Sequence, residues 1–375
     1  MIKNKDKGIT LIALVITIII LLILAGISIS ALTNQGLFKN AKAAQNATEK
    51  AEKEQGQRLN EYEDEINKYL NNANEDEKIG LITDNINKEL SKTDNTKLKD
   101  EKGNRIVVPA GFKIVNGATT VNKGIVIVDV TETKTKGSQF VWVPVGTITK
   151  ADGTTATITL GRYDFDATTG KESTYSGSYI EEDANDTSTL KKYGNTIAKN
   201  ITNFKNSVAT NGGYYIGRYE ARTATARSAK DNALTQITEK GTENVYNYVT
   251  QLQAAQLSQN MYNSDKFTSD LMNSYAWDTA TVFIQNCGTN SKYSRQNSLN
   301  TSLAQKGITT DIQCNIYDMA GNVYEWTTET SLNSSNHCGA RGGSYIDSSK
   351  YTSFRNSIGT SGSGIHVGFR PLLYL

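Results

Sequence analysis

The side chains that most often carry nucleophilic, redox or metal chemistry are scarce in this chain of 375 residues. It contains three cysteines and two histidines. An odd number of cysteines allows at most one intrachain disulfide bond, so the chain is not a disulfide-stapled scaffold. Two histidines argue against a histidine-based metal centre or charge relay, and the sequence offers no Ser/His/Asp or paired-carboxylate arrangement. These residues favour a binding or structural role over catalysis.

The overall composition excludes further classes of protein. Lysine and arginine number 40 against 38 aspartates and glutamates, which leaves a net charge of +2. A chain with so little net charge has no global field that attracts nucleic acid, so we expect no nucleic-acid partner. Only three prolines occur, whereas tyrosine (19), asparagine, threonine, serine and glycine are abundant. This composition indicates a polar, outward-facing β protein and is a poor fit to a soluble cytoplasmic enzyme.

An uncharged, apolar segment begins close to the N-terminus. It extends over the 24 residues from Ile9 to Leu32 and follows Lys3, Lys5 and Lys7. At about 1.5 Å per residue, a helix of this length measures roughly 36 Å and can cross a bilayer. Basic residues before such a segment keep that end in the cytoplasm. We therefore expect a single-pass protein of the cell membrane with its large domain outside the cell.

The junction between the basic and apolar segments carries a more specific signal. Gly8 directly precedes Ile9, and the motif Lys-Gly-Ile-Thr-Leu-Ile resembles the signal of type IV prepilins. The resemblance implies that prepilin peptidase removes residues 1–8 and that the mature chain begins at Ile9. It also implies other pilin subunits as partners in a pilus-like filament. Pilins usually begin with Phe and carry Glu at the fifth mature position, where this chain has Ala13, so a plain signal anchor is the alternative.

The helical pattern continues beyond the apolar segment. From Leu37 to Tyr69, apolar residues recur at steps of three and four among Lys and Glu, and no proline interrupts them. We expect a transmembrane and amphipathic helix over residues 9–72, as in a pilin, or a membrane helix followed by a short coiled-coil stalk. Residues 73–104 are rich in Asn, Asp, Lys and Glu, and we predict a polar linker with one short helix.

From Arg105 onward, short apolar runs alternate with Gly, Asn, Thr and Ser, which is typical of strands and turns. Residues 146–210 indicate a hairpin and long loops. The clearest predicted strands are Ile106–Pro109, Phe112–Val115, Gly124–Val130, Phe140–Val145 and Gly213–Glu220, and the predicted helices are Asn244–Met261 and Ser269–Gln285.

Several motifs of this region together resemble one family. They are Phe140-Val-Trp-Val-Pro-Val-Gly, Tyr215-Ile-Gly-Arg-Tyr-Glu, Trp277-Asp, Asp318-Met-Ala-Gly-Asn-Val-Tyr-Glu-Trp, Arg341-Gly-Gly-Ser-Tyr and Gly368-Phe-Arg. Their order is that of formylglycine-generating-enzyme-type, or sulfatase-modifying-factor, domains. The resemblance implies a C-type-lectin-like fold for residues 105–375. The expected class is α+β, with a long N-terminal transmembrane, pilin-type helix followed by this domain.

The resemblance also bears on catalysis. Enzymes of the family hold copper with two cysteines that follow Arg-Gly-Gly-Ser-Tyr, and Cu(I) prefers such soft thiolates. The corresponding positions in this chain are Asp347 and Thr352, and its three cysteines lie outside that spacing. We therefore expect no catalytic residues and no enzymatic activity. A working sulfatase-modifying-type enzyme is the less favoured alternative.

A structural calcium ion is a further implication of the resemblance. Related domains hold it with a side-chain oxygen, two carbonyls and a glutamate, and the matching positions are Asp318, Gly321, Val323 and Glu325. Calcium takes six to eight hard oxygen ligands, which two carboxylates, two carbonyls and water can supply. The alternative is that Glu325 caps a turn or pairs with an arginine.

The segment from Ser331 to His366 has a biased composition. It contains no Glu, Gln, Trp or Met and one Lys. This bias is similar to that of variable proteins of diversity-generating retroelements, which use a lectin-like fold for ligand display and diversify Asn codons. The general Asn and Ser richness of the chain is another explanation. Either way, Tyr, Ser, Gly and Asn suit recognition of an extracellular protein or glycan.

We expect the ligand to bind between the motifs Arg341-Gly-Gly-Ser and Gly368-Phe-Arg, where a loop can vary without disturbing the core. The predicted contact residues are Tyr345, Asp347, Ser349, Tyr351, Phe354, Asn356 and Ser361. Alternatively, Tyr345 and Phe354 are core residues, or the recognition face lies on the loops of residues 146–210. The sequence thus predicts an adhesin-like surface protein, with a structural type IV pilin or pseudopilin as the alternative.

Overall fold

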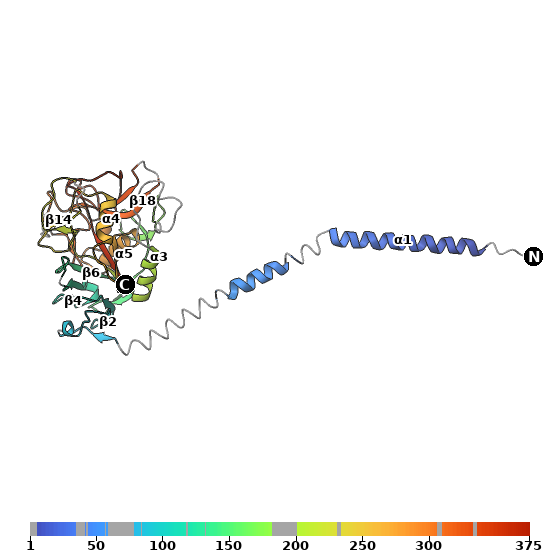
Figure 1. The fold of residues 1–375 in the computed structure, drawn as a ribbon, viewed down its shortest axis with the longest axis horizontal. Coiled ribbons are helices and arrows are strands. Elements are labelled where there is room, and N and C mark those ends of the chain that lie inside the picture. Colours follow the sequence, from blue (N-terminus) through green and yellow to red (C-terminus); the bar gives the residue numbers. More distant parts are fainter. Residues whose placement is uncertain are drawn as a thin grey trace, which may run out of the picture. The chain divides into compact units, whose positions relative to one another are not determined.

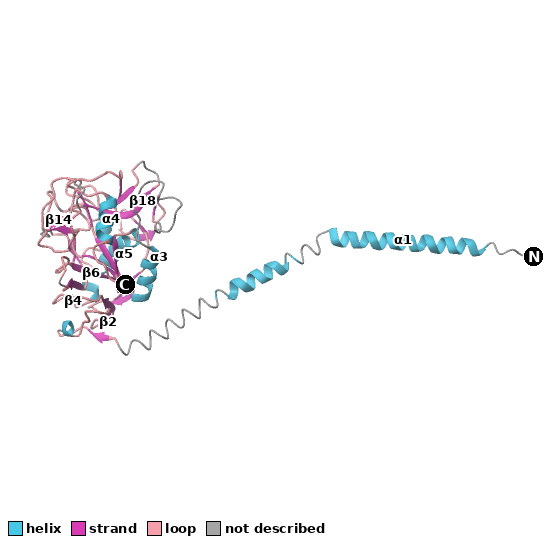
Figure 2. Ribbon diagram, in the orientation of Figure 1, coloured by secondary structure: helices cyan, strands magenta, loops and turns pink. Residues whose placement is uncertain are grey.

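The computed structural model describes residues 6–34, 42, 44–56, 58, 79–83, 85–117, 119–131, 133–181, 201–230, 234–305, 310–332 and 336–375. The chain divides into two compact units, Met1–Lys78 and Ile79–Leu375 (Figure 1). Helix dominates the described part of the first unit, whereas the second unit mixes helices and strands, as predicted (Figure 2).

The first unit contains helix α1 (Asp6–Asn34), in which Gly8 and Ile9 lie close to the N-terminal end. Its large apolar side chains between Leu14 and Ile27 are exposed. A further helical stretch covers residues 44–56, but the connection between the two, and residues 59–78, lie outside the described residues. A continuous helix over residues 9–72 therefore stays a prediction. Within the described part of the chain, no helix has both the length and the apolar character of a membrane span.

A six-stranded antiparallel sheet forms the centre of the second unit. Its strand order is β15-β22-β12-β6-β5-β4. Trp142 and Tyr215 face each other in register across β6 and β12, and both are fully buried. The strands are β4 (Phe112–Ile114), β5 (Val126–Asp129), β6 (Gln139–Pro144), β12 (Gly213–Gly217), β15 (Thr268–Leu271) and β22 (Pro371–Tyr374).

A second sheet positions the candidate site. Its order is β11-β18-β19-β20, and β21 pairs in parallel with β18. All eight residues of β18 are buried, so this strand is the centre of the sheet. The strands are β11 (Tyr179–Ile180), β18 (Tyr324–Ser331), β19 (Cys338–Arg341), β20 (Arg355–Ile358) and β21 (Val367–Phe369).

Both predicted helices of the domain begin later than their apolar spacing indicated. Residues Asn244–Val245 form strand β14, and Thr250 caps α4 (Gln251–Gln259) through a capping box with Gln253. Residues 268–271 form β15, and the side chain of Asn273 caps α5 (Ser274–Cys287). Side-chain caps satisfy the free N–H groups of a first helical turn, which is why each helix begins directly after its polar residue.

The polar-linker prediction for residues 73–104 is wrong from Ile79 onward. Strands β1 (Gly80–Leu81), β2 (Thr96–Lys99) and β3 (Arg105–Val108) form one sheet, and Leu98 is buried. The predicted short helix is reduced to the 3₁₀ turn η1 (Ile86–Lys88). This region is ordered although it has few apolar residues, because the buried Asp100 side chain also connects its segments. Asp100 accepts hydrogen bonds from the Asn104 and Val121 N–H groups, both at 2.9 Å.

The loops predicted over residues 146–210 contain two hairpins, β7–β8 and β9–β10. The remaining elements are β7 (Gly146–Thr149), β8 (Thr155–Ile158), β9 (Tyr163–Phe165), β10 (Glu172–Thr174), α3 (Ile201–Asn211), β13 (Arg222–Thr223), η2 (Val121–Lys123), η4 (Tyr293–Arg295), β16 (Ile312–Gln313) and β17 (Ile316–Tyr317).

Candidate functional site

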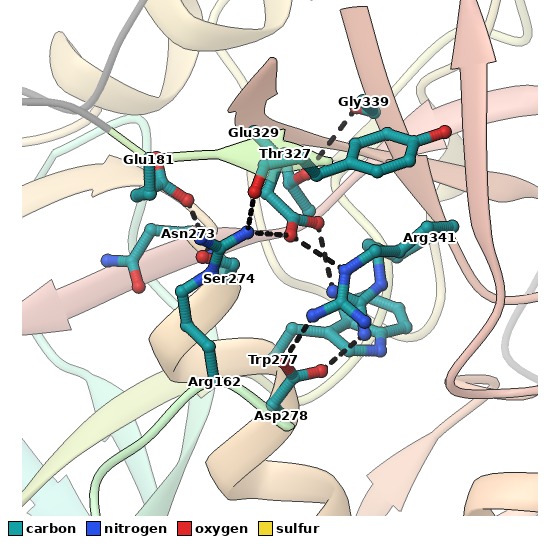
Figure 3. A network of polar contacts seen from close by, with 12 residues as sticks. Arg162, Glu181, Asn273, Ser274, Trp277, Asp278, Thr327, Glu329, Gly339 and Arg341 are labelled. Carbon is teal, nitrogen blue, oxygen red and sulfur yellow. Dashed lines mark hydrogen bonds and ion pairs between the residues drawn. The ribbon is translucent and has the colours of Figure 1, made fainter. Parts of the chain in front are cut away.

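A buried network of charged side chains supports one end of the second sheet (Figure 3). Arg341, the last residue of β19, is fully buried and pairs with Glu329 of β18 at 2.9 Å. Its other guanidinium nitrogen pairs with Asp278 of α5. The guanidinium carbon lies 5.6 Å from the ring centre of Trp277. The arginine of the Arg-Gly-Gly-Ser motif therefore connects a helix to the sheet.

Two further arginines complete the network. Arg355 of β20 donates from Nε to Glu329 at 2.9 Å and from Nη2 to Asp278 at 2.5 Å. Arg162 donates to Glu329 at 3.0 Å. Burial alone would raise the pKa of Glu329, but the three guanidinium groups hold it well below its usual range. Three arginines thus share two buried carboxylates.

The ring of Tyr175 covers two of these arginines, and the backbones of two further tyrosines contact them. The ring centre of Tyr175 lies 4.0 Å from the guanidinium carbon of Arg355 and 4.5 Å from that of Arg162. Arg162 also donates to the carbonyl of Tyr179 at 2.7 Å, and Arg355 donates to that of Tyr163 at 3.2 Å. We call these five residues, of which the Arg355 and Arg162 side chains are 9% and 15% exposed, the tyrosine–arginine patch. It joins segment 162–179 to β20, so the two alternative recognition faces predicted from the sequence meet on one surface.

Five of the seven predicted ligand contacts fall into three groups. Asn356 lies on β20 beside Arg355 and pairs with Ala340. Tyr351 and Phe354 pack edge to face with 5.8 Å between their ring centres. The guanidinium carbon of Arg295 lies 3.5 Å from the ring centre of Tyr351.

Asp347 forms the third group. It accepts hydrogen bonds from Ser349 Oγ at 2.6 Å and Tyr324 Oη at 3.1 Å. The hydrogen bond from Ser349 lowers the pKa of Asp347. Ser349 and Ser361 are exposed, whereas Tyr345 is half-buried.

The alternative that some of these residues belong to the core holds in part. Phe354 is half-buried and packs against the hydrophobic core. None of the five patch residues was predicted from the sequence as a ligand contact. The available signal was the three tyrosines at positions 163, 175 and 179, close to Arg162 in a polar loop region.

The predicted calcium ligands lie in a buried acidic region. Asp318 is buried and adopts a left-handed backbone conformation with φ of 62°. Glu325 is also buried, but Arg370 Nη2 and Nε donate to its two oxygens at 2.5 and 3.0 Å. The arginine pairing that the sequence left open is therefore present. Across the described residues, no three His, Cys, Asp or Glu side chains form a group that could hold a metal ion.

The charge around Glu325 is nevertheless unbalanced. Glu220, Glu239, Asp318 and Glu325 are buried together with the two arginines Arg222 and Arg370. Burial, followed by the charge of Asp318, raises the pKa of Glu220 well above its ordinary value. The carboxylate of Glu220 accepts hydrogen bonds from Asn322 Nδ2 at 2.7 Å and Val323 N at 3.2 Å. A cation or bound protons would offset the excess negative charge, so calcium stays a prediction.

The donor set does not fit a copper centre. Asp347 and Thr352 occupy the positions of the family's copper cysteines, and the buried Thr352 accepts a hydrogen bond from Trp277 Nε1 through its carbonyl at 2.9 Å. The chain's cysteines lie elsewhere, at the end of α5, in the turn between β16 and β17, and in β19. Burial raises the pKa of Cys287 to about 11 and that of Cys338 to about 12, and it also raises that of Cys314. All three thiols therefore keep their protons at neutral pH.

Comparison with known proteins places the chain in a family. Residues 130–373 match the sulfatase-modifying factor enzyme 1-like domain. Among solved structures, Treponema denticola variable protein 1 is similar with 13% identity and a TM-score of 0.36, covering 65% of this chain and 98% of that chain. CarF is similar with 15% identity and a TM-score of 0.24, covering 34% and 66%.

No curated protein matches the sequence. The domain match extends over more than half of the chain and confirms the resemblance drawn from its motifs. The chain therefore belongs to the family with a sulfatase-modifying factor enzyme 1-like domain.

Proposed function

We propose that the protein is an adhesin-like surface protein whose lectin-like domain binds an extracellular protein or glycan without catalysing a reaction. The observation that carries this proposal is the tyrosine–arginine patch. Tyr and Arg are the residue types that most often dominate binding energy at interfaces. Their placement over a buried ion-pair network means that the patch is ordered before a ligand arrives, which lowers the entropic cost of binding.

The non-catalytic part of the proposal rests on donor chemistry. Asp347 and Thr352 offer hard oxygen atoms where the family's enzymes use thiolates. The raised pKa values of the three cysteines leave no thiolate nucleophile at neutral pH.

Diversification of the C-terminal segment is a finer part of the proposal. The biased segment 331–366 contains β20 and the loops on either side of it. Arg341 and Arg370, both fully buried, hold the backbone close to the two ends of its loop-rich part. Substitutions at exposed positions between these arginines, such as Ser349 and Ser361, can therefore alter the surface while the ion pairs preserve the fold.

The N-terminal unit is the basis of our proposal for the location of the protein. We propose that Ile9–Leu32 anchors the chain in the membrane, or in a type IV pilus-like filament after cleavage behind Gly8. A second candidate function, a structural filament subunit, is supported by the exposed apolar side chains of α1, which can pack against neighbouring pilin helices.

Binding of fluorescently labelled full-length protein to intact cells and to an array of immobilised glycans tests the main proposal. The double variant Tyr175→Ala/Tyr351→Ala should lose binding while its melting temperature stays within a few degrees of the wild type. Lys113→Ala, at an exposed position of β4, is the control and should bind normally. Undiminished binding by the double variant would place the recognition face elsewhere, and detection of the protein only as a major component of sheared filaments would favour the structural role.

A further inference from the structure

A concave site lies apart from the tyrosine–arginine patch. It has a volume of about 650 Å³ and is lined by parts of segments 92–93, 110–112, 131–135 and 261–267, together with Gln236. None of these residues belongs to the patch or to the predicted ligand contacts. Its size is that of a site for a small molecule or a single sugar unit.

The floor of this pocket is apolar. Phe112, Tyr262 and Phe267 form a compact cluster in which the ring centres lie 5.4 to 5.8 Å apart. Phe112 and Phe267 are buried, and the half-buried Tyr262 completes the surface. A floor of this kind can pack against the C–H face of a sugar ring.

One wall consists of threonine hydroxyls whose positions are set by a buried carboxylate. Asp129 accepts hydrogen bonds from Thr131 Oγ1 at 2.5 Å, Thr135 Oγ1 at 2.6 Å and Tyr262 Oη at 3.2 Å. Thr133 Oγ1 lies within 3.0 Å of the hydroxyls of both Thr131 and Thr135. Because Asp129 connects this wall to the aromatic floor, the pocket is ordered before it binds anything, and the threonine oxygens can still accept hydrogen bonds.

The rim of the pocket is positively charged. The described lining contains three lysines and one aspartate, Asp265. Lys266 forms an exposed ion pair with Asp94 at 3.3 Å. Lys92 and Lys134 therefore supply the remaining positive charge of the described lining, against the single negative charge of Asp265. A ligand that fits must combine an apolar ring face, hydroxyl groups and an anionic group.

We propose that this pocket binds an acidic monosaccharide unit, such as a uronic acid. The ring packs on the Tyr262 and Phe267 side of the floor, hydroxyl groups donate to the threonine wall, and the carboxylate lies against Lys92 and Lys134. This site is separate from the proposed recognition face, so the domain has two independent places for ligand recognition.

Titration of full-length protein with methyl glucuronide tests the proposal, with saturation-transfer NMR as the readout. The matched probe is methyl glucoside, which differs only in carrying CH₂OH in place of the carboxylate. We expect a dissociation constant on the order of 1 mM for the glucuronide and at least tenfold weaker binding of the glucoside. Added salt should weaken glucuronide binding because its charged contacts are exposed.

Variants of the protein test whether the glucuronide binds in this pocket. The double variant Lys92→Gln/Lys134→Gln should lose the preference for the glucuronide, whereas Lys113→Gln and Tyr175→Ala/Tyr351→Ala should keep it. Equal binding of the two glycosides, or none of either, would overturn the proposal. Equal affinity for cyclohexanecarboxylate, which has the ring and the charge but no hydroxyls, would show that the pocket does not recognise a sugar. The Tyr175/Tyr351 variant separates failure of this site from failure of the recognition face.

Discussion

Arg341 and Arg355 face each other in register on β19 and β20, and both pair with Asp278 and Glu329. Two like charges opposite each other on neighbouring strands normally destabilise a sheet. The two buried carboxylates reverse that effect and connect α5, β18, β19 and β20. The surface that we propose for recognition therefore depends on a charge balance beneath it.

Removal of one carboxylate from this ion-pair network should destabilise the folded protein. We expect Glu329→Gln to lower the free energy of unfolding by about 3–5 kcal/mol, because three guanidinium groups then share one buried carboxylate. Urea denaturation provides the measurement, and the exposed Glu101→Gln is the control, with a change within about 0.5 kcal/mol. A Glu329→Gln protein as stable as the wild type would mean that the network contributes nothing to folding.

Stability should also depend on Glu181 near neutral pH. Burial, followed by the charge of Glu329, raises the pKa of Glu181 from an ordinary value of 4.5 to about 7. Between these two values the folded state binds more protons than the unfolded state, so this group makes stability fall as the pH rises from 4.5 to 7. Glu181→Gln should be more stable than the wild type at pH 8, by an amount on the order of 2 kcal/mol, and should lose that advantage below pH 5.

Chemical denaturation of both proteins at pH 5 and pH 8 measures this difference. Glu101→Gln again serves as the control and should show no pH-dependent gain. A Glu181→Gln variant that is equally stable, relative to the wild type, at both pH values would show that the carboxyl group titrates normally.

Calcium should stabilise the domain if the acidic region around Asp318 binds it. We expect EDTA to lower the melting temperature of the full-length protein and added calcium, but not magnesium, to restore it. Asp318→Asn should weaken the response to calcium. Glu325→Gln is a poor probe, because it also breaks the ion pair with Arg370. Identical melting curves with EDTA and with calcium would show that the region does not bind calcium. Protonation of buried glutamates would then offset its excess negative charge.

Processing of the N-terminus provides the last test. In cells with a prepilin peptidase, intact-mass analysis should find a mature chain that begins at Ile9. Gly8→Leu should block cleavage, because a peptidase pocket that accepts glycine has little room for a larger side chain. Retention of residues 1–8 by the wild-type protein would identify a plain anchor.

Elements that are marked by a pattern within their own residues could be predicted from the sequence. The apolar runs around Phe140 and Gly213 form β6 and β12 close to the expected positions, and Trp142 and Trp326 are fully buried. Helix starts were placed too early, because apolar spacing does not reveal that Thr250 and Asn273 cap the helices.

The tyrosine–arginine patch could not be derived in the same way. Its contact between Arg355 and Tyr163 joins residues 192 positions apart, and only the path of the chain brings them together. The role of Glu329 was hidden for a similar reason, since an acidic residue within a strand normally indicates an exposed position. Its burial makes sense only with three arginines from other segments around it.

Strand β18 carries both Glu325, which pairs with Arg370, and Glu329, which pairs with Arg341. The chain between the two arginines is therefore attached by an ion pair at each end to the same strand, β18. The entropy of closing such a loop depends only weakly on its length, and a doubling costs about 0.6 kcal/mol. Insertions next to the exposed Ser348 and Ser349 should therefore be nearly neutral for folding, whereas changes at the buried Thr352, which accepts a hydrogen bond from Trp277, should not. This part of the domain could accept grafted loops of different lengths, which makes it a natural starting point for selecting new binders from libraries.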